Sequence, residues 1–519
     1  MQIIINELTV PVGAAADELV AAAAQRLGVP KTAVTLVKIL RRSLDARSRR
    51  GGVCYVVNAV WDVARPLDKS QFLKLKAAPY APAPPLRFPA VNFAVNLTGR
   101  PLVIGAGPAG LTAAYVLAQA GARPLILERG QPLGERRRAV GDFWGRGAFN
   151  PESNVFFGEG GAGAFSDGKL TARTKDLAAK DYFLELLVRC GAAPEILYEA
   201  QPHLGSDRLA QIIPRWRALI EELGGEFRFG ARVDDLLIDA GECRGVRVGD
   251  ETLNADAVFL AAGHSADDVY EMLRRRGVAL TLKGYALGVR LEMPQECVNR
   301  SQWGGDADRL ARTVGAASFF FTQKNGSGYT FCMCPGGRVI AGATGAGRLA
   351  TNGMSSSARR EQWANAAVLF PQAPAADARA TVTTIEASAF QAGGGDYSLP
   401  ATTLSAFPRA PRDLPAGSVR RVRPADFRQI LPARLIDDLC AYLPSVARQC
   451  RCESAPVLIY GAETRSTSPT RVERGENGES VNCRGLYPLG EGAGYAGGIV
   501  SSAIDGLRAA EKFLRTMTN

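Results

Sequence analysis

Apolar and polar residues follow the spacing of short strands and one helix over the first 78 residues. The runs at 3–10, 33–44 and 51–63 are short and rich in β-branched residues, which is typical of strands. Residues 17–29 instead repeat apolar side chains at helical spacing. We therefore predict a small α/β domain over residues 1–78.

Prolines interrupt this pattern in the next segment. They stand at positions 79, 82, 84, 85 and 89. Proline at this density favours an extended, semi-rigid spacer over helix or strand. We predict a linker at 79–98.

Beyond the linker, the pattern changes to strand, glycine turn, helix and strand. This α/β pattern continues over 99–283. A less regular, strand-rich stretch follows at 284–454, and a glycine-rich segment with a helix occupies 455–519. We expect domain boundaries at these changes of pattern.

A Gly-x-Gly-x-x-Gly sequence opens the α/β pattern at 105–110. An apolar strand at 102–104 precedes it, and a helix at 111–120 follows it. A second apolar strand at 125–127 ends at Glu128. This order of strand, turn, helix, strand and acid is typical of a dinucleotide-binding fold.

Each residue of this motif has a physical role. Gly105 permits the tight turn, Gly107 lets the backbone approach a pyrophosphate, and Gly110 allows the helix to pack closely on the strand. The helix N-terminus directs free N–H groups and its positive dipole end at the phosphates. Glu128 can accept hydrogen bonds from both ribose hydroxyls and disfavours a 2′-phosphate. The motif therefore predicts an adenosine dinucleotide such as FAD or NAD.

The same glycine spacing occurs twice more, in different contexts. At 158–163 neither an apolar helix nor a second strand with a terminal acid follows, so this loop is predicted to lie against a flat ring. At 492–497 the glycines lead into an amphipathic helix, and Glu491 precedes them. A second helix N-terminus with an acid suits the far half of a long dinucleotide. We therefore expect FAD, because a simple NAD domain does not require this second site.

The composition is that of an ordinary globular protein. The chain has 519 residues, with 46% hydrophobic and 22% charged, which predicts two to four domains. The N-terminal residues do not resemble a secretory leader, and apolar runs of about 18 residues are missing, so we expect a soluble, cytoplasmic protein with no membrane partner. Ten cysteines in such a chain are expected to be reduced thiols.

The formal net charge is +11, from 62 basic and 51 acidic residues. Part of the excess is local, at 38–50 and 136–138. Such runs are usually solvated faces, and few aromatic residues are interleaved with them, so nucleic-acid binding is a minority interpretation. The basic balance instead motivates a small anionic substrate.

Several long motifs resemble one bacterial family. They are FGEGGAGAFSDGKL, AAGHSADDVYEML, YTFCMCPGGRVI, TNGMS, ETRSTSP and GLYPLGEGAGYAGGIVSSAIDG. Together they are similar to the bacterial FAD-dependent dehydrogenases, FAD-utilising flavoproteins with an α/β N-terminal extension. The resemblance implies a Rossmann-type, glutathione-reductase-like FAD domain that is split in the sequence into 99–283 and 455–519. It implies an inserted α+β substrate domain at 284–454.

The resemblance also implies which residues contact FAD. It places the phosphates over Gly105, Gly107 and Gly110, the adenosine ribose on Glu128, and Arg136 near the phosphates or ribose. It places adenine beside the backbone of Val233, Gly263 at the end of a strand beside the cofactor, and the ribityl chain on Glu491. Further cofactor contacts are expected within the same motifs at Pro108, Ala109, Arg129, Gly161, Ala162, Ser166, Ala262, Gly490, Gly498 and Ile499.

Four residues are candidates for the chemistry. His264 follows a buried strand and precedes Ser265, which is expected to cap the next helix in a capping box with Asp268. His264 would then lie at the rim of the cofactor, as a catalytic group or as a backbone contact. Lys169, after the glycine loop, could stabilise developing negative charge or be solvated. Arg290 and Arg465 are alternative anion anchors, or else structural ion-pair residues.

The two Cys-x-Cys pairs, Cys332/Cys334 and Cys450/Cys452, are weaker candidates. Metal sites and flavin-linked disulfides usually use longer spacings, and Cys332-Met-Cys334 fits the alternation of a strand. We therefore predict no metal site.

The sequence as a whole predicts an FAD-dependent oxidoreductase, a dehydrogenase or reductase, of a small and anionic metabolite. Transient NAD(P)H or another electron carrier stays a candidate partner, since a second dinucleotide fold for NAD(P)H is not apparent. Two alternatives remain open. One is a flavin-containing RNA-associated protein that uses its basic N-terminal domain, and the other is a non-redox flavoenzyme.

Overall fold

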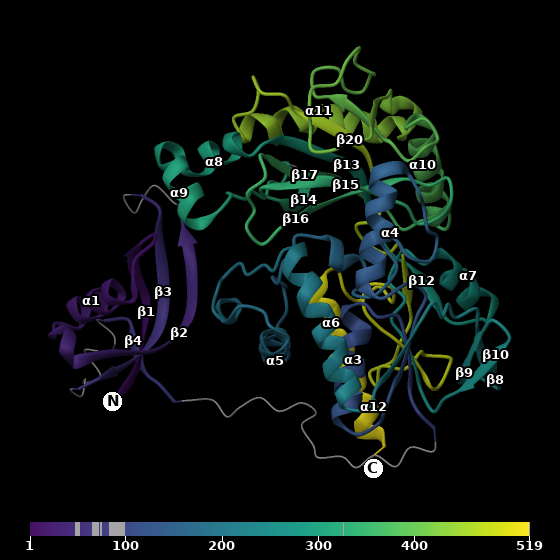
Figure 1. The fold of residues 1–519 in the computed structure, drawn as a ribbon, viewed down its shortest axis with the longest axis horizontal. Helices are drawn as coiled ribbons and strands as arrows, with labels where there is room; N and C mark the ends of the chain where they lie inside the picture. Colours follow the sequence, from purple (N-terminus) through teal and green to yellow (C-terminus); the bar gives the residue numbers. More distant parts are fainter. Residues whose placement is uncertain (47–51, 65–71, 73–74, 82–98, 325, 518–519) are drawn as a thin grey trace.

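The structure, a computed structural model, describes residues 1–46, 52–64, 72, 75–81, 99–324 and 326–517. Figure 1 shows an amino-terminal unit, a unit around a five-stranded sheet, and a unit around a six-stranded sheet. The predicted α/β class with a parallel sheet is confirmed. Most of the predicted linker, residues 82–98, lies outside the described residues.

The amino-terminal unit is a helix packed on an antiparallel sheet with the strand order β2-β3-β1-β4. Buried Ile3, Ile5 and Trp61 form its core with the apolar face of the helix. The predicted strands and helix are present, and a short fourth strand joins the edge. The elements are β1 (Gln2–Pro11), α1 (Ala16–Leu27), β2 (Val34–Asp45), β3 (Cys54–Val63) and β4 (Ala77–Pro79).

Strand β2 connects this unit to the rest of the molecule. Its residue Arg42 donates its backbone N–H to the carbonyl of Tyr198 and accepts from the N–H of Ala200, both at 2.8 Å. The Arg42 guanidinium also forms an ion pair with Glu199 and lies over the ring of Tyr55. The edge of the small sheet is therefore continued by a segment of the neighbouring unit.

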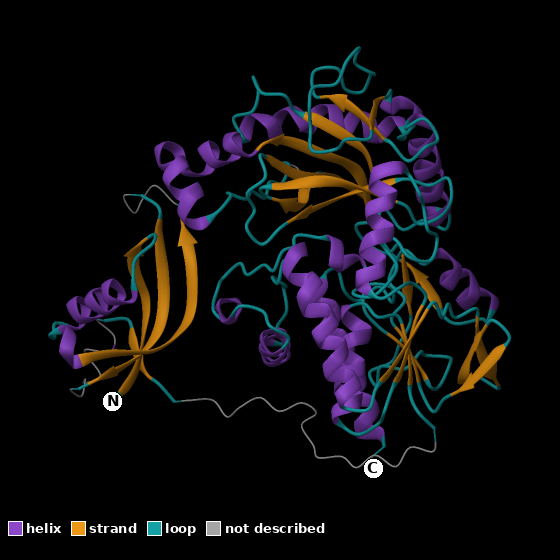
Figure 2. Ribbon diagram, in the orientation of Figure 1, coloured by secondary structure: helices purple, strands orange, loops and turns teal. Residues whose placement is uncertain are grey.

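The second unit contains a parallel sheet with the strand order β22-β11-β5-β6-β7. In Figures 1 and 2, helices α3, α6 and α12 cover one face of this sheet and the small sheet β8–β10 lies beyond the other. The helices are α3 (Pro108–Gln119), α4 (Leu133–Arg146), α5 (Leu177–Arg189), α6 (Ser206–Glu222), α7 (Asp267–Arg275) and α12 (Ile499–Thr516). The strands are β5 (Leu102–Ile104), β6 (Leu125–Glu128), β7 (Glu226–Phe229), β8 (Asp235–Asp239), β9 (Glu242–Val248), β10 (Glu251–Asn254), β11 (Val258–Leu260), β12 (Leu280–Leu282), β21 (Thr470–Val472) and β22 (Leu486–Pro488).

The strands β22, β11, β5 and β6 of this sheet are buried on both faces, whereas the edge strand β7 is partly exposed. In β11, Phe259 packs with the helices α3 and α12, whereas Val258 and Leu260 belong to the core on the opposite face. Val103 and its neighbours in β5 divide in the same way. Such double burial explains why these strands are short, continuous apolar runs in the sequence.

The third unit contains a six-stranded sheet with the order β14-β17-β13-β20-β18-β19. Helices α10 and α11 pack against it (Figure 1). Its helices are α8 (Gln295–Trp303), α9 (Ala307–Val314), α10 (Ala378–Ala392) and α11 (Ala433–Gln449). Its strands are β13 (Tyr285–Pro294), β14 (Tyr329–Cys334), β15 (Gly337–Gly342), β16 (Ala350–Ser355), β17 (Trp363–Gln372), β18 (Leu399–Thr403), β19 (Val422–Pro424) and β20 (Leu458–Glu463).

Strand β20 corrects the boundary that we expected at 454/455. It lies in the middle of the six-stranded sheet, antiparallel to β13 and β18, and so belongs to the third unit. Backbone pairing with β13 and β18 decides the placement of this buried, apolar strand, although β20 adjoins the glycine-rich segment in the sequence. Among the helices of the described residues, none combines the length and apolarity that crossing a bilayer requires.

Candidate functional site

One cavity lies between the five-stranded and six-stranded units. Its walls come from β5, β6, α12 and the segment after β11 on one side and from β14, β16 and the end of β20 with the segment after it on the other. Nineteen of the predicted site residues line it: Gly105, Gly107, Pro108, Ala109, Glu128, Arg129, Gly161, Ala162, Ser166, Lys169, Val233, Ala262, Gly263, His264, Arg465, Gly490, Glu491, Gly498 and Ile499. Gly110, Arg136 and Arg290 do not.

Two helices begin at this cavity although the sequence separates them widely. Helix α3 begins after Gly107 and helix α12 after Gly498, and these N-cap glycines line the same cavity. Neither N-cap is closed by a side chain of the described residues. The first N–H groups of both helices are therefore available to an anionic ligand.

Glycines allow the backbone of the turn after β5 to pack closely against its neighbouring segments. A Cβ atom at Gly105, whose φ is +101°, would lie 2.4 Å from the carbonyl oxygen of Ala261. A Cβ at Gly110 would lie 1.9 Å from the carbonyl oxygen of Gly105. Gly110 thus lies behind the cavity, where α3 packs on the turn.

The carboxylate of Glu128 is held by the backbone. It accepts N–H groups from Ala106 at 2.8 Å, Gly130 at 2.9 Å and Gly158 at 3.0 Å. A carboxylate has about four acceptor positions, so about one remains for a ligand. The expected contact of Glu128 with both ribose hydroxyls stays a prediction.

Arg129 closes the cavity next to Glu128. Its guanidinium pairs with Glu152 at 2.8 Å and Asp268 at 3.0 Å, and it lies over the ring of Phe157 at 4.4 Å. Burial opposes its charge, but these two carboxylates raise the pKa of Arg129 above its ordinary value. It is a fixed part of the wall.

Arg136 corrects the expectation of a phosphate or ribose contact. Its side chain is fully buried, and it donates to the backbone carbonyls of the glycine loop at Asn154, Val155, Gly158, Glu159 and Gly161. Burial lowers the pKa of Arg136 to about 10. The residue shapes the loop against which a ring could lie and does not itself reach the cavity.

Arg290 likewise does not reach the cavity, so it is not an anion anchor for a ligand there. Its guanidinium is fully buried and forms a two-pronged pair with Glu463 at 2.8 and 2.9 Å. A third contact, 2.8 Å long, runs to Asn365. Of the two arginines predicted to be anion anchors, Arg290 and Arg465, only Arg465 lines the cavity.

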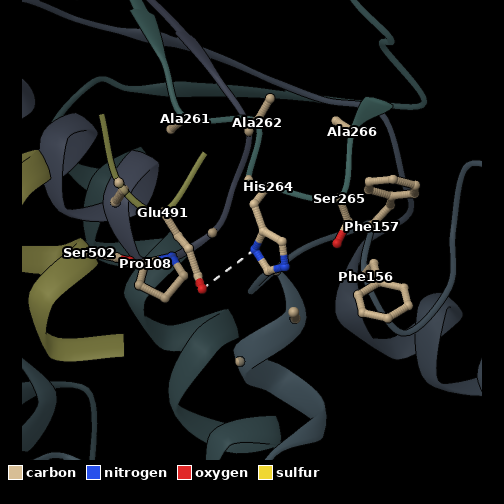
Figure 3. A pocket seen from close by; sticks show the side chains of 18 of the residues that line it. Pro108, Phe156, Phe157, Ala261, Ala262, His264, Ser265, Ala266, Glu491 and Ser502 are labelled. Atoms are coloured by element: carbon tan, nitrogen blue, oxygen red, sulfur yellow. Dashed lines mark ion pairs between the residues drawn. The ribbon is translucent and has the colours of Figure 1, made fainter. Parts of the chain in front are cut away.

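His264 and Glu491 both line the cavity, and their side chains point toward each other (Figure 3). The Nδ1 atom of His264 is 3.5 Å from the Glu491 carboxylate, and its Nε2 atom is 3.0 Å from the carbonyl oxygen of Arg465. The carbonyl only accepts, so Nε2 carries a hydrogen. Nδ1 is left facing the carboxylate.

Ser265 corrects the predicted capping box. Helix α7 begins after Ala266, whose side chain cannot cap it, and the Ser265 hydroxyl caps nothing. This hydroxyl is buried on the cavity wall beside Phe156 and Phe157 and has no partner among the described residues (Figure 3). A buried hydroxyl without a partner is costly, which indicates that a polar ligand atom completes its hydrogen bonding. The two open helix N-termini and this hydroxyl fit a long, polar dinucleotide.

Lys169 is part of a small charge cluster. Its ammonium pairs with Asp167 at 2.7 Å and donates to the carbonyl of Met333, while Arg359 binds the same Asp167 through two nitrogens. Burial opposes the charge of Asp167, but Lys169 and Arg359 lower the pKa of its carboxyl. Two cations share one carboxylate, which leaves a positive charge at the wall.

Arg465 belongs to a second cluster. Its guanidinium binds Glu386 at 2.6 Å and Asp267 at 3.0 Å, and Arg348 and Arg379 also bind Asp267. Three guanidinium groups thus face two carboxylates. Although burial disfavours its charge, the two carboxylates raise the pKa of Arg465 further.

Sequence reasoning missed the partners in both clusters. Arg359, Asp267 and Glu386 come from segments remote from Lys169 or Arg465, and local spacing does not connect them. It also missed that Cys332 and Cys334 both line the cavity. The motifs that resemble the bacterial family include Lys169, Arg465 and the two cysteines, but they do not show which residues form ion pairs with Lys169 and Arg465.

Family comparisons match three segments of the chain. Residues 284–466 match the FAD-dependent protein, C-terminal domain-like family, and residues 103–157 match an NAD(P)-binding Rossmann-like domain. Residues 1–60 match a domain of unknown function. The first two matches each include residues that line the cavity.

Two relatives and one solved structure are similar to the chain to different extents. An uncharacterised protein of Clostridium beijerinckii is 35% identical over 517 residues, 94% of each chain. A probable electron transfer flavoprotein-quinone oxidoreductase of Escherichia coli is 29% identical over 167 residues, 31% of this chain and 36% of that protein. A geranylgeranyl bacteriochlorophyll reductase-like protein of Thermoplasma acidophilum is 13% identical, with a TM-score of 0.36 over 81% of this chain and 79% of that one.

The cofactor follows from the matched domains. FAD is the cofactor of the family that matches 284–466, and the open helix N-termini and the unpartnered Ser265 hydroxyl fit it. The relative from Clostridium beijerinckii shares nearly the whole length of the chain. This chain therefore belongs to a family of FAD-dependent oxidoreductases that also contains the Clostridium beijerinckii protein.

Proposed function

We propose that the protein oxidises or reduces a small organic anion with FAD bound in the cavity between the two large units. One observation carries this proposal: the N-termini of α3 and α12 line the same cavity, which continues to the six-stranded unit. A long dinucleotide can span the two helix starts. Its reactive end then faces the charged wall.

The residues of the first wall would hold FAD. The N-terminus of α3 takes the pyrophosphate, and one free acceptor position of Glu128 takes a ribose hydroxyl. The backbone near Val233 lies at the adenine end, and Glu491 lies at the ribityl chain. The flat ring lies against the loop at 161–163. When bound, FAD supplies two-electron transfer through this ring.

The opposite wall would select an anion. Lys169 keeps 37% of its side chain accessible, and its cluster holds two cations for one carboxylate. The Arg465 cluster holds three cations for two carboxylates. In a partly desolvated cavity, an excess positive charge attracts a carboxylate or phosphate more strongly than it does in water.

His264 would exchange a proton at the reacting end. Its Nε2–H is engaged by the Arg465 carbonyl, so the ring orientation is set. Nδ1 is free to exchange a proton with Glu491 or with a bound substrate. A positioned imidazole is suited to general acid–base catalysis.

The first experiment identifies the cofactor. Purified protein should be yellow, and heating should release FAD and not FMN. Glu128→Ala should reduce the FAD content per protein, because the ribose contact and three backbone interactions are lost. Glu226→Ala, which removes an exposed carboxylate of the same sheet, should keep full FAD content. Full FAD occupancy in Glu128→Ala would contradict the role of Glu128.

The second experiment identifies the substrate class. Under anaerobic conditions, organic acids and neutral metabolites are mixed with the protein, and bleaching of the flavin absorbance is recorded. We expect bleaching by an acid, and a KM at least about tenfold higher in Lys169→Met. Lys175→Met, an exposed lysine outside the cavity, is the control. Product without any bleaching would instead indicate a non-redox flavoenzyme.

A further inference from the structure

Two thiols lie together on the cavity wall. Cys332 and Cys334, near the end of β14, both line the cavity. Both are free cysteines, and the Cys334 thiol donates to the backbone carbonyl of Cys332 at 3.4 Å. They are therefore neighbours within the site assigned to FAD, and the proposed chemistry does not use them.

The backbone at this pair departs from a regular strand. The pairing of β14 with β17 shifts by one residue between Phe331 and Cys334, which is a β-bulge. Cys332 has a φ of +41°, in the left-handed region that non-glycine residues seldom adopt. In an extended strand, residues two apart are separated by about 6.6 Å, near the upper limit of Cα separation for a disulfide. The bulge interrupts the regular alternation of side chains along β14, and both cysteines face the same cavity, which brings the two thiols to one side of the strand.

Cations surround the pair. Lys169 donates to the carbonyl of Met333, between the two cysteines, and Arg290 donates to the carbonyl of Cys332 at 3.4 Å. Cys332 as a whole residue is exposed at the cavity wall. Desolvation of the thiol raises the pKa of Cys332 to about 12, although Lys169 and Arg290 act in the opposite direction. Both thiols are therefore protonated at neutral pH. They are expected to react with a partner inside the cavity and only slowly with oxidants in solution.

We propose that Cys332 and Cys334 form a dithiol–disulfide pair that exchanges one electron pair with FAD in this cavity. Oxidation breaks the two S–H bonds and forms one S–S bond. The two electrons and two protons pass to FAD, which becomes reduced. The reverse transfer restores both thiols. This inference rests on the proposed placement of FAD.

The test counts electrons in the intact holoprotein. After mild oxidation, anaerobic dithionite titration of the wild type should consume four electrons per FAD, two for the flavin and two for the disulfide. Cys332→Ser and Cys334→Ser should each consume two. Cys440→Ser is the matched control, because it removes an exposed thiol on α11 and should leave the count at four. A wild type that consumes only two electrons would overturn the inference.

A second readout does not depend on the flavin. Alkylation and peptide mapping of the oxidised wild type should find Cys332 and Cys334 joined to each other and protected from alkylation, whereas Cys440 is alkylated. Two alkylated thiols at 332 and 334 would also overturn the inference. FAD content separates the two proposals. If the protein contains full FAD but consumes two electrons, only the dithiol inference is refuted. If the protein binds no FAD, the proposed function itself is refuted.

Discussion

At the scale of single residues, the charged side chains are set by partners that are distant in the sequence. From the sequence, Lys169 is either a group that stabilises negative charge or a solvated lysine, and Arg290 and Arg465 are each either an anion anchor or a structural ion-pair residue. The structure distinguishes them because Glu463 takes up both donor sides of Arg290, whereas the other two line the cavity. A local sequence pattern predicts the helix, strand or loop on which a charged residue lies. Such a pattern does not predict an ion pair with a carboxylate on a strand more than a hundred residues later, as Arg290 forms with Glu463.

Asp167 illustrates how such a pairing responds to pH. Its folded-state pKa is lowered by Lys169 and Arg359, against the effect of burial. A lowered pKa stabilises the fold above the ordinary carboxyl range, and this contribution is lost as the pH falls through the folded-state pKa. Asp167→Asn leaves two cations unpaired and should cost about 3–5 kcal/mol at pH 7.

The measurement is the urea midpoint of wild type and Asp167→Asn between pH 3 and pH 7. The gap between them should be wide at neutral pH and should narrow below about pH 4, where the wild-type carboxyl begins to protonate. Asp413→Asn, at a site whose side chain is 91% exposed, should track the wild type throughout. A gap independent of pH would show that the charge of Asp167 is not its stabilising property.

At the scale of elements, local periodicity predicted most of the cofactor-binding part. The strands β5 and β6 and the helix α3 are recognised in the sequence because apolar runs and the glycine turn between them are local patterns. The place of β20 is not, because a strand in the middle of a mixed sheet is defined by its neighbours β13 and β18. The capping box at Ser265 failed for a related reason, since the serine is oriented toward the cavity and not toward α7.

The contact between α3 and α12 is testable at one glycine. A Cβ at Gly506 of α12 would lie 2.0 Å from the carbonyl oxygen of Ala109, next to the start of α3. Gly506→Ala should therefore force the two helices apart and lower the free energy of unfolding by about 1–3 kcal/mol. It should also reduce the FAD content. The readouts are thermal unfolding and the ratio of flavin to protein absorbance.

Gly141 is a matched control within another helix. It lies in α4, is exposed, and a Cβ there would meet nothing within 4 Å. Gly141→Ala should stabilise the protein by about 0.5–1 kcal/mol, because alanine loses less backbone entropy in a helix. Equal destabilisation by both substitutions would refute the close helix contact.

At the scale of the whole molecule, the amino-terminal unit contributes no described residue to the cavity wall. Its connection through Arg42 is to the segment at 198–200. We expect Arg42→Ala to accelerate hydrogen exchange at the amide of Ala200 and to leave FAD content unchanged, with a stability loss below about 1 kcal/mol. Arg41→Ala, an exposed neighbour, should change neither quantity. Loss of FAD from Arg42→Ala would show that the unit supports the site.

The last strand of the parallel sheet has a consequence for biosynthesis. Strand β22 and helix α12 complete a layer whose other members, β5, β6 and α3, leave the ribosome several hundred residues earlier. Until then, β11 carries an unpaired edge and α3 an uncovered apolar face, which are features that chaperones recognise in nascent chains. A flavin that contacts the N-termini of both α3 and α12 can therefore bind only after α12 has been synthesised and has packed beside α3.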